Sequence, residues 1–560
     1  MPAPGIRERL ADIRLPAPQY SYMNRTKLTF AALAVAMVLA ACQGTETETP
    51  PQKPNILFAI MDDATYMHMS AYGCAFVNTP NFDRVAKNGI LFKNAYTPNA
   101  KCSPSRSCIL TGRNSWQLEQ AANHWPYFPE KFKVFTEVLA ENGYAVASTG
   151  KGWAPGIATR ADGSKRNLMV NTFSEIKTTP PTSKISNVDY AANFTAFLDQ
   201  KGEEPFFFWY GGLEPHRAYE YGSGIAKGGK QLAMVKDSDV FDFWPAVDSV
   251  KTDLLDYAFE IEYFDKQLGK MLDTLEARGQ LSNTLVVITA DNGMPFPRVK
   301  GQEYEYSNHL PLAVMWADGI ANRGRKIDDY ISFIDFAPTF LELAEVPEGA
   351  AGMQAIAGRS FTDILYSEKD GQVDPRRDYV MIGKERHDIG RPNDWGYPIR
   401  GLVKDGKLYL HNFETDRWPG GNPETGYLNC DGGATKSVVL NTVFNPDVAR
   451  YWQMSFGKRP QDEFYDIAND PDCMENLALS EAHREMMTSM KNDLFGRLKE
   501  QGDPRMFGNG ALFDQYTYSD KKGVNFYERY FNGEDVGWGW VNATDFQDLS
   551  GVKLPEASMD

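Results

Sequence analysis

The chain has 560 residues, of which 42% are hydrophobic and 13% aromatic, enough for one large domain and a smaller one. This composition excludes a disordered or fibrous chain. The formal net charge of −16 argues against general nucleic-acid binding, because phosphate backbones need a basic protein face. We therefore expect a globular protein without a nucleic-acid partner, in which any site for an anion is locally basic.

The N-terminus carries a targeting pattern. Arg25 and Lys27 precede an apolar run over residues 28–41, too short and too alanine-rich for a membrane span and typical of a secretory signal peptide. The run ends in Leu-Ala-Ala followed by Cys42, which resembles the bacterial lipobox, in which the cysteine is lipidated. An ordinary cleaved signal is the alternative. Met23 is a second plausible start, so we interpret residues 1–22 as an over-extended gene model or a dispensable extension. We expect a lipoprotein signal at residues 23–42 and a linker at 43–54.

Residues 55–378 alternate short apolar runs with amphipathic helical segments. This pattern predicts an α/β fold with a large, mostly parallel sheet flanked by helices. The clearest predicted strands are residues 56–61, 144–148, 206–210 and 284–290, and the clearest predicted helices are residues 254–275 and 336–345, the second capped by Asp335.

Each of the four predicted strands is followed by polar residues. These are Asp62 and Asp63, then Lys151, then the segment EPH at 214–216, then Asp291 with Asn292. In open α/β sheets, ligands bind beyond the carboxyl ends of the strands. The sequence therefore predicts one polar site assembled from distant segments.

Beyond residue 378 the pattern changes to short strands among turns. Residues 379–382 and 407–410 are predicted strands, and a helix is expected over 481–501. We interpret residues 379–510 as a smaller α+β subdomain with an antiparallel sheet. Residues 511–560 form an aromatic, turn-rich tail.

The segment CSPSR at residues 102–106, continued by LTGR at 110–113, resembles the signature of the type I sulfatase family in the alkaline-phosphatase-like superfamily. The resemblance spans roughly residues 55–480 and includes NTPNFD at 78–83, GILFKNAY at 89–96, EPHR at 214–217, DNG at 291–293 and FYD at 464–466. It implies a sulfatase fold and hydrolysis of sulfate esters or sulfamates. It also implies that a maturation enzyme oxidises Cys102 to formylglycine (3-oxoalanine), whose diol is the nucleophile.

The resemblance also implies a metal site. Its expected ligands are the modified Cys102 with Asp62, Asp63, Asp291 and Asn292. Hard oxygen ligands of this kind suit calcium, with magnesium as the weaker alternative.

The remaining expected catalytic groups are basic. Lys151, His216 and Lys300 are candidates for sulfate contacts and leaving-group protonation, and Arg106 for holding the diol and the carboxylates. Trp153 stands where many sulfatases have a histidine. Many sulfatases have another histidine shortly after TGR, where this chain has Ser115 and Trp116. His124 is a candidate replacement for this second imidazole, and a packed loop residue is the alternative.

Further motifs are similar to the heparan N-sulfatase (sulfamidase) branch, above all DNGMPFP at residues 291–297. They leave N-sulfate and O-sulfate substrates both open. A sulfated glycan is the expected substrate, and its expected contacts are Arg217, Arg386, His387, Arg391, Asp394 and Arg400. A solvated charged loop is the alternative for the last five.

Two rival functions stay open, and so does the disulfide pairing. A phosphonate or phosphate monoesterase of the same superfamily is one rival function, and a glycan-binding lipoprotein with a dead sulfatase fold is another. Export would permit disulfides, but Cys74, Cys108, Cys430 and Cys473 allow three pairings. Lipidation at Cys42 would confine membrane contact to the anchor, in the periplasm or at the outer membrane or surface of a Gram-negative bacterium.

Overall fold

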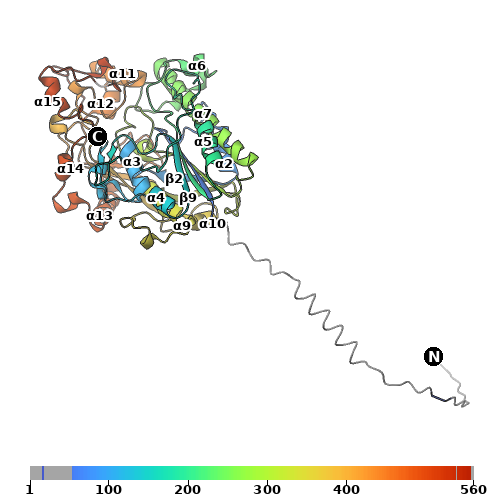
Figure 1. The fold of residues 1–560 in the computed structure, drawn as a ribbon. Helices are drawn as coiled ribbons and strands as arrows, with labels where there is room; N and C mark the ends of the chain where they lie inside the picture. The colour runs from blue at the N-terminus through green and yellow to red at the C-terminus, as the bar shows by residue number, and fades with distance from the viewer. Residues whose placement is uncertain (1–15, 18–52, 538, 556–560) are drawn as a thin grey trace, which may run out of the picture. The chain divides into compact units, whose positions relative to one another are not determined.

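The structure, a computed structural model, describes residues 16–17, 53–537 and 539–555 (Figure 1). The predicted signal peptide, Cys42 and nearly all of the predicted linker lie outside the described residues. Residues from Lys53 onward cluster as one compact unit, so the expected boundaries at residues 378 and 510 stay predictions.

A seven-stranded sheet organises the first part of this unit, with the strand order β4-β6-β1-β7-β8-β2-β9. All neighbours pair in parallel except at β8, which runs antiparallel to β7 and β2. The predicted fold class, a large and mostly parallel sheet, is confirmed. The strands of this sheet are β1 (Asn55–Met61), β2 (Ile90–Tyr96), β4 (Ala145–Gly150), β6 (Phe206–Gly211), β7 (Thr284–Ala290), β8 (Leu312–Met315) and β9 (Arg325–Ser332).

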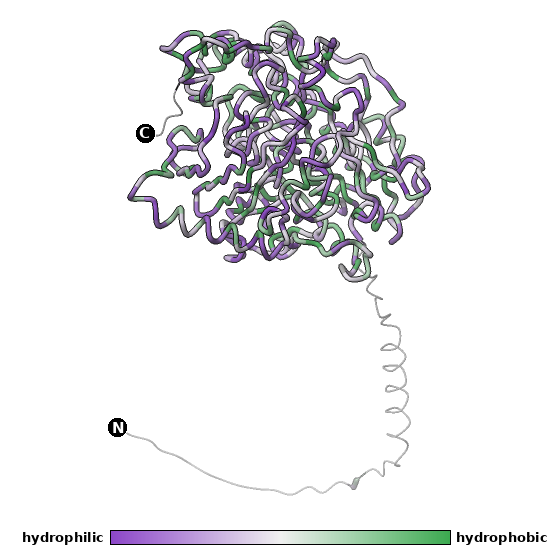
Figure 2. The backbone as a smooth tube through the Cα atoms, turned by 90° about the vertical axis from the view of Figure 1, so that its left-hand side faces the viewer, coloured by the Kyte–Doolittle hydropathy of each residue, from purple (hydrophilic) through white to green (hydrophobic). Residues whose placement is uncertain are grey.

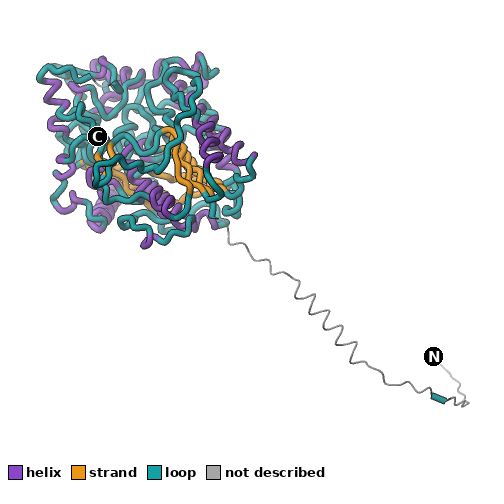
Figure 3. Tube along the Cα trace, in the orientation of Figure 1, coloured by secondary structure: helices purple, strands orange, loops and turns teal. Residues whose placement is uncertain are grey.

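The central strands are buried on both faces because helices cover both sides of the sheet, as Figure 3 shows. Leu57 and Ala59 of β1 belong to the apolar cluster that includes α2, α5 and α7. Their neighbours Ile56 and Phe58 belong to the cluster that includes α3, α4 and α9. Figure 2 shows hydrophobic and hydrophilic stretches alternating along the folded backbone.

Within the described residues the helices have the following bounds: α2 Pro80–Lys87, α3 Cys102–Thr111, α4 Phe135–Glu141, α5 Tyr190–Gln200, α6 Ser223–Ala226, α7 Asp248–Ala277, α8 Glu305–Asn308, α9 Phe336–Leu343, α10 Thr362–Tyr366, α11 Ala434–Asn441, α12 Arg450–Phe456, α13 Arg484–Glu500, α14 Leu512–Gln515 and α15 Phe526–Phe531. None of these helices has the length and apolar character needed to cross a membrane.

A second sheet confirms the predicted antiparallel layer. Its strand order is β10-β11-β12-β13, and each neighbouring pair is antiparallel. Its strands are β10 (Tyr379–Lys384), β11 (Ile399–Lys404), β12 (Lys407–Asn412) and β13 (Asp462–Tyr465), and a separate short parallel pair joins β3 (Tyr127–Phe128) to β5 (Ile157–Ala158).

The helix cap at Asp335 and the possible disulfides differ from what the sequence indicates. Asp335 precedes α9, but its carboxylate accepts from the backbone N–H groups of Ser332 and Arg359 and pairs with Arg377, so it does not cap the helix. The cysteines that the structure describes, Cys102 among them, are all free. None of the three disulfide pairings is therefore formed.

Candidate active site

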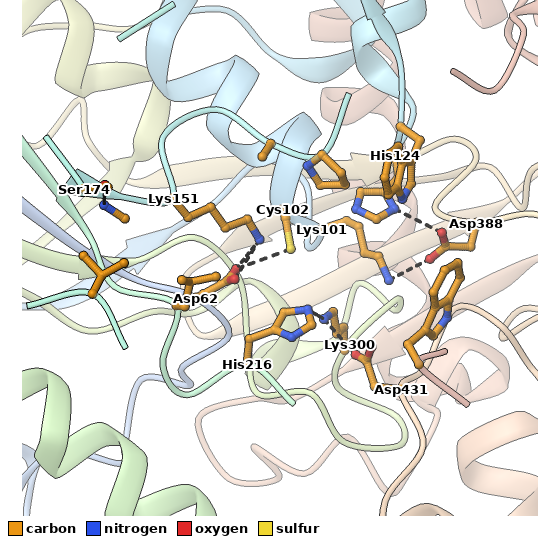
Figure 4. A pocket seen from close by; sticks show the side chains of 17 residues that line it. Asp62, Lys101, Cys102, His124, Lys151, Ser174, His216, Lys300, Asp388 and Asp431 are labelled. Atoms are coloured by element: carbon orange, nitrogen blue, oxygen red, sulfur yellow. Dashed lines mark hydrogen bonds and ion pairs between the residues drawn. The ribbon is translucent and has the colours of Figure 1, made fainter. Parts of the chain in front are cut away.

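The carboxyl ends of four parallel strands meet at one place. Asp62 follows β1, Lys151 follows β4, His216 lies shortly after β6, and Asp291 follows β7. Parallel pairing of β1 with both β6 and β7 places these ends side by side. Figure 4 shows Asp62, Lys151 and His216 around Cys102.

Three buried carboxylates form the floor of the site. Oxygen atoms of Asp62, Asp63 and Asp291 all lie within 4.8 Å of one another, and we call this set the carboxylate cluster. Each of the three residues is at most 1% exposed. Asp63 has a positive φ of 74°, and its backbone N–H donates to Asp291 Oδ1 at 3.0 Å. This left-handed turn carries the chain from the strand into the cluster.

Basic side chains offset the charge of the carboxylate cluster. Lys151 Nζ donates to both oxygens of Asp62, at 2.7 and 2.8 Å. Burial alone would raise the pKa of Asp62, but the Lys151 ammonium holds it below its ordinary value. Arg106 Nε donates to Asp291 Oδ2 at 2.8 Å, and Arg106 Nη1 donates to the carbonyl of Lys151 at 2.7 Å. One guanidinium therefore ties two strand ends together.

Lys300 occupies the centre of a second polar group. Its Nζ lies 2.6 Å from Asp63 Oδ2, 2.7 Å from Asp431 Oδ2 and 3.1 Å from His216 Nε2. His216 Nδ1 contacts the carbonyl of Arg217, which fixes the proton on Nδ1 and leaves Nε2 as the acceptor from Lys300. Sequence reasoning placed Lys300 and His216 at this site and missed Asp431, which lies in an irregular segment.

Cys102 is the first residue of α3 and is 2% exposed. Its Sγ lies 3.5 Å from Asp62 Oδ1 and 3.9 Å from Asp63 Oδ1. Burial and the neighbouring carboxylates raise the pKa of this thiol above its ordinary value, and Lys151 opposes them. The helix is anchored beside the cluster because Ser105 Oγ donates to the carbonyl of Asp291 at 2.6 Å.

The carboxylate cluster with Asn292 fits a hard cation. Asn292 Nδ2 donates to Asp63 Oδ1 at 2.7 Å, whereas Asn292 Oδ1 is buried and has no hydrogen-bond partner within the described residues. A buried acceptor without a donor is costly unless a cation or another group completes it. Three carboxylates and one amide oxygen match the all-oxygen preference of calcium or magnesium. Groupings of carboxylates with His216 or Cys102 also exist, but their mixed donors suit these ions less well.

A cavity of about 500 Å³ opens above this floor. Its size suits a small-molecule or sugar ligand. The residues that line it are Asp62, Lys101, Cys102, His124, Trp125, Gly150, Lys151, Ala154, Pro155, Ser174, Val188, Leu213, His216, Lys300, Asp388, Asp431 and Trp540.

His124 lines this cavity, but its polar contact is not with Cys102. His124 Nδ1 lies 3.1 Å from Asp388 Oδ1. Trp153 occupies the position where many sulfatases have a histidine. It donates through Nε1 to Ser107 Oγ at 2.8 Å and packs against Phe128. His124 therefore brings no imidazole into contact with Cys102 in this structure, and Trp153 has none to offer.

The four arginines expected to contact substrate do not line the cavity, and their side chains are buried against partners within the protein. Arg217 makes two hydrogen bonds to Asp253. Arg386 and Arg391 donate to backbone carbonyls. Arg400 pairs with Asp503 and Glu385. Local sequence pattern does not show which acceptor each arginine meets in the fold.

His387 and Asp394 also lie outside the cavity lining. His387 Nε2 lies 2.7 Å from Asn99 Oδ1 within the interior. Asp394 Oδ2 accepts from the backbone N–H of Asn525 at 2.7 Å and holds part of the C-terminal tail. The segment that contains His387 reaches the cavity lining through Asp388.

A buried site that gathers carboxylates for a cation and lysines for an anion is suited to hydrolysis of an anionic ester. The sequence profile of the family described as Sulfatase matches residues 54–346, more than half of the chain. The chain therefore belongs to the sulfatase family, a family of sulfuric ester hydrolases.

Several curated relatives resemble most of the chain. Human N-sulphoglucosamine sulphohydrolase is 24% identical over 515 residues, which cover 85% of this chain and 94% of that protein. An ulvan-active sulfatase of Formosa agariphila is 26% identical and covers 81% of each chain. An N-acetylglucosamine-6-O-sulfatase of Bacteroides thetaiotaomicron is 27% identical, covering 71% of this chain and 85% of that protein.

Solved structures share the fold. One is described as a complex with its substrate D-glucosamine-2-N,6-O-disulfate; it has a TM-score of 0.56 at 20% identity and covers 81% of this chain and 99% of that chain. Another, described as a complex with a neocarrahexaose, has a TM-score of 0.55 at 18% identity and covers 86% of this chain and 98% of that chain.

Proposed function

We propose that this protein removes sulfo groups from a sulfated glycan, with a calcium ion as cofactor and a formylglycine made from Cys102 as nucleophile. The observation that carries the proposal is the position of Cys102 at the start of α3, with its sulfur 3.5 Å from Asp62 and the basic groups of Lys151, Lys300 and His216 around the same cavity. Family membership supports the reaction class.

Two groups that the chain would acquire complete the chemistry. Calcium held by Asp62, Asp63, Asp291 and Asn292 would supply positive charge to the oxygens of the sulfo group. Conversion of Cys102 to formylglycine would supply a hydrated aldehyde as an oxygen nucleophile, which an unmodified thiol does not offer.

The chain's own residues bind and orient the sulfo group. Lys151 and Lys300 donate to its oxygens, because their ammonium groups line the cavity on two sides of Cys102. Arg106 holds Asp291 and the end of β4 in place, so the carboxylates keep their spacing. We assign protonation of the leaving-group oxygen or nitrogen to Lys300, whose ammonium His216 Nε2 orients.

Relatives guide the choice of substrate. Their names refer to N-sulfated glucosamine, 6-O-sulfated N-acetylglucosamine and ulvan. We infer a sulfated glycan substrate for this chain, with both sulfamate and sulfate ester bonds to be tested. We also propose that the protein is exported and lipid-anchored through Cys42 in a Gram-negative cell, on the signal pattern of residues 23–42.

Turnover by the protein matured with a formylglycine-generating enzyme tests the proposal. We expect wild-type protein to desulfate glucosamine N-sulfate, N-acetylglucosamine 6-sulfate or another sulfated oligosaccharide, with mass spectrometry detecting the aldehyde at position 102. Cys102→Ala removes turnover and keeps the fold. Cys108→Ala is the matched control, because Cys108 is a free, buried cysteine of the same helix.

Three outcomes would contradict the proposal. Full turnover by Cys102→Ala would exclude the nucleophile. Faster hydrolysis of an aryl phosphate than of the matching aryl sulfate would favour a phosphate monoesterase. Glycan binding by an aldehyde-containing protein that hydrolyses no sulfate or sulfamate would favour a binding protein.

A further inference from the structure

The cavity has a second polar end, away from the carboxylate cluster. Figure 4 shows Asp62 and Lys151 on one side of Cys102, and Asp388 with His124 on the other. Lys101 Nζ lies 2.8 Å from Asp388 Oδ2, and His124 Nδ1 lies 3.1 Å from Asp388 Oδ1. We call Lys101, His124 and Asp388 the distal triad. Its members are 3%, 7% and 1% exposed.

His124 lines the cavity and has an unpaired hydrogen-bond acceptor. Burial lowers the pKa of His124 to about 4, although Asp388 opposes the shift, so the ring is neutral near pH 7. Its contact with the Asp388 carboxylate places the single ring proton on Nδ1. Nε2 is then an acceptor, and it is buried without a hydrogen-bond partner among the described residues. A ligand donor would satisfy this atom.

The distal triad carries no surplus positive charge. Lys101 is paired with Asp388, which also accepts from the Tyr518 hydroxyl at 3.3 Å. The other lysines of the cavity lining, Lys151 and Lys300, are paired at the reactive end. No arginine lines the cavity within the described residues. A second anionic group placed at the distal end would therefore meet the Asp388 carboxylate, a neutral acceptor and a lysine whose charge Asp388 already balances.

Two tryptophans line the same cavity as the distal triad. Trp125 and Trp540 both line the cavity. Trp125 has a positive φ of 51°, a conformation that a bulky residue adopts only under surrounding constraint, and its carbonyl accepts from the Ser519 N–H at 2.8 Å. Trp540 Nε1 donates to the carbonyl of Leu428 at 3.1 Å. Fixed rings of this kind suit the apolar face of a sugar.

We propose that the distal triad, in the cavity that Trp125 and Trp540 also line, is a subsite for an uncharged part of a pyranose ring, in which His124 Nε2 accepts a hydrogen bond from a sugar hydroxyl. The subsite selects rings that carry a sulfo group at the reactive end and a free hydroxyl at the distal end. This inference rests on the proposed sulfatase function and adds a specificity rule to it.

Binding to a variant that cannot turn over tests the subsite apart from catalysis. In the Cys102→Ala background with calcium present, calorimetry measures the Kd for N-acetylglucosamine 6-sulfate and for glucosamine N-sulfate. Adding His124→Ala weakens the better ligand about tenfold, the effect of losing one hydrogen bond to a buried acceptor. Adding His483→Ala, the same change in a part of the chain outside the cavity lining, leaves the Kd unchanged.

A second experiment tests the charge selectivity of the subsite. Asp388→Asn keeps the shape and frees the Lys101 ammonium, so affinity for glucosamine N,6-O-disulfate relative to the better monosulfated sugar rises about tenfold. Equal Kd values with and without His124→Ala, or an unchanged ratio in Asp388→Asn protein with a native circular dichroism spectrum, would overturn the inference.

The two proposals fail in different ways. If wild-type protein hydrolyses neither sugar sulfates nor 4-nitrophenyl sulfate while the binding effects hold, the sulfatase function fails and the subsite stands. If turnover is normal and His124→Ala lowers kcat/KM equally for 4-nitrophenyl sulfate and for the sugar sulfate, the subsite is wrong. A loss about tenfold larger for the sugar supports it.

Discussion

Replacing Arg217 by methionine is expected to cost stability and to leave substrate affinity intact. The guanidinium makes hydrogen bonds of 2.8 and 2.6 Å to the two oxygens of Asp253 in α7, and the two side chains are 5% and 2% exposed. Methionine retains most of the apolar volume and removes the charge. Asp253 is then left as a buried carboxylate without its cation.

The size of the stability loss depends on the hydrogen bonds that Asp253 retains. Breaking a buried ion pair costs about 3–5 kcal/mol. Asp253 still accepts from the Thr435 N–H and hydroxyl, at 3.0 and 2.7 Å, so we expect the lower end, about 3 kcal/mol. An unfolding entropy scaled to a unit of this size, roughly 1 kcal/mol/K, converts this loss to a fall in Tm of about 3 °C.

Differential scanning calorimetry measures the change, with steady-state kinetics on a sulfated sugar beside it. The double variant Arg217→Met/Asp253→Asn is the control, because asparagine still accepts from Thr435 and carries no charge; it should recover more than half of the lost stability. An unchanged Tm combined with a tenfold higher KM would refute this reasoning and return Arg217 to the substrate site.

Two further perturbations probe the charges. Stripping calcium with a strong chelator should abolish turnover and lower Tm, since a cation bound only to the native carboxylate cluster stabilises it; added calcium should restore both, and full activity of metal-free protein would contradict the ligand assignment. Glu385 is paired with Arg400 and Arg505, which hold its pKa below the ordinary value despite burial. Its contribution is therefore present above its unfolded pKa and is lost as pH falls through the folded pKa. Glu385→Gln should flatten the fall in the urea midpoint between about pH 6 and about pH 3, and a slope equal to that of wild type would count against the pairing.

The convergence of the reactive groups was predictable because it follows from topology. Asp62, Lys151, His216 and Asp291 each follow a predicted strand, and parallel strands bring their carboxyl ends to one edge of a sheet. The predicted strand over residues 284–290 coincides with β7 (Thr284–Ala290). Apolar runs bounded by polar residues therefore sufficed to place the floor of the site.

The rest of the cavity was not predictable from local pattern. Asp388, Asp431 and Trp540 lie in irregular segments, whose path no periodicity fixes. The density of charged residues between residues 386 and 400 predicted contacts with substrate, with a solvated charged loop as the alternative. Arg400 instead finds Asp503, which is remote in sequence, and pairing buries both side chains. A single sequence shows charge but does not show which distant partner neutralises it.

The walls of the cavity come from opposite ends of the folded chain. Asp62 follows the first strand, whereas Trp540 lies within the last described segment. During protein synthesis the acidic floor therefore emerges long before the aromatic wall. A product that stops short of residue 540 would hold every reactive group but lack Trp540 in its cavity lining. A protein fused to the C-terminus would be attached shortly after Trp540 in the sequence.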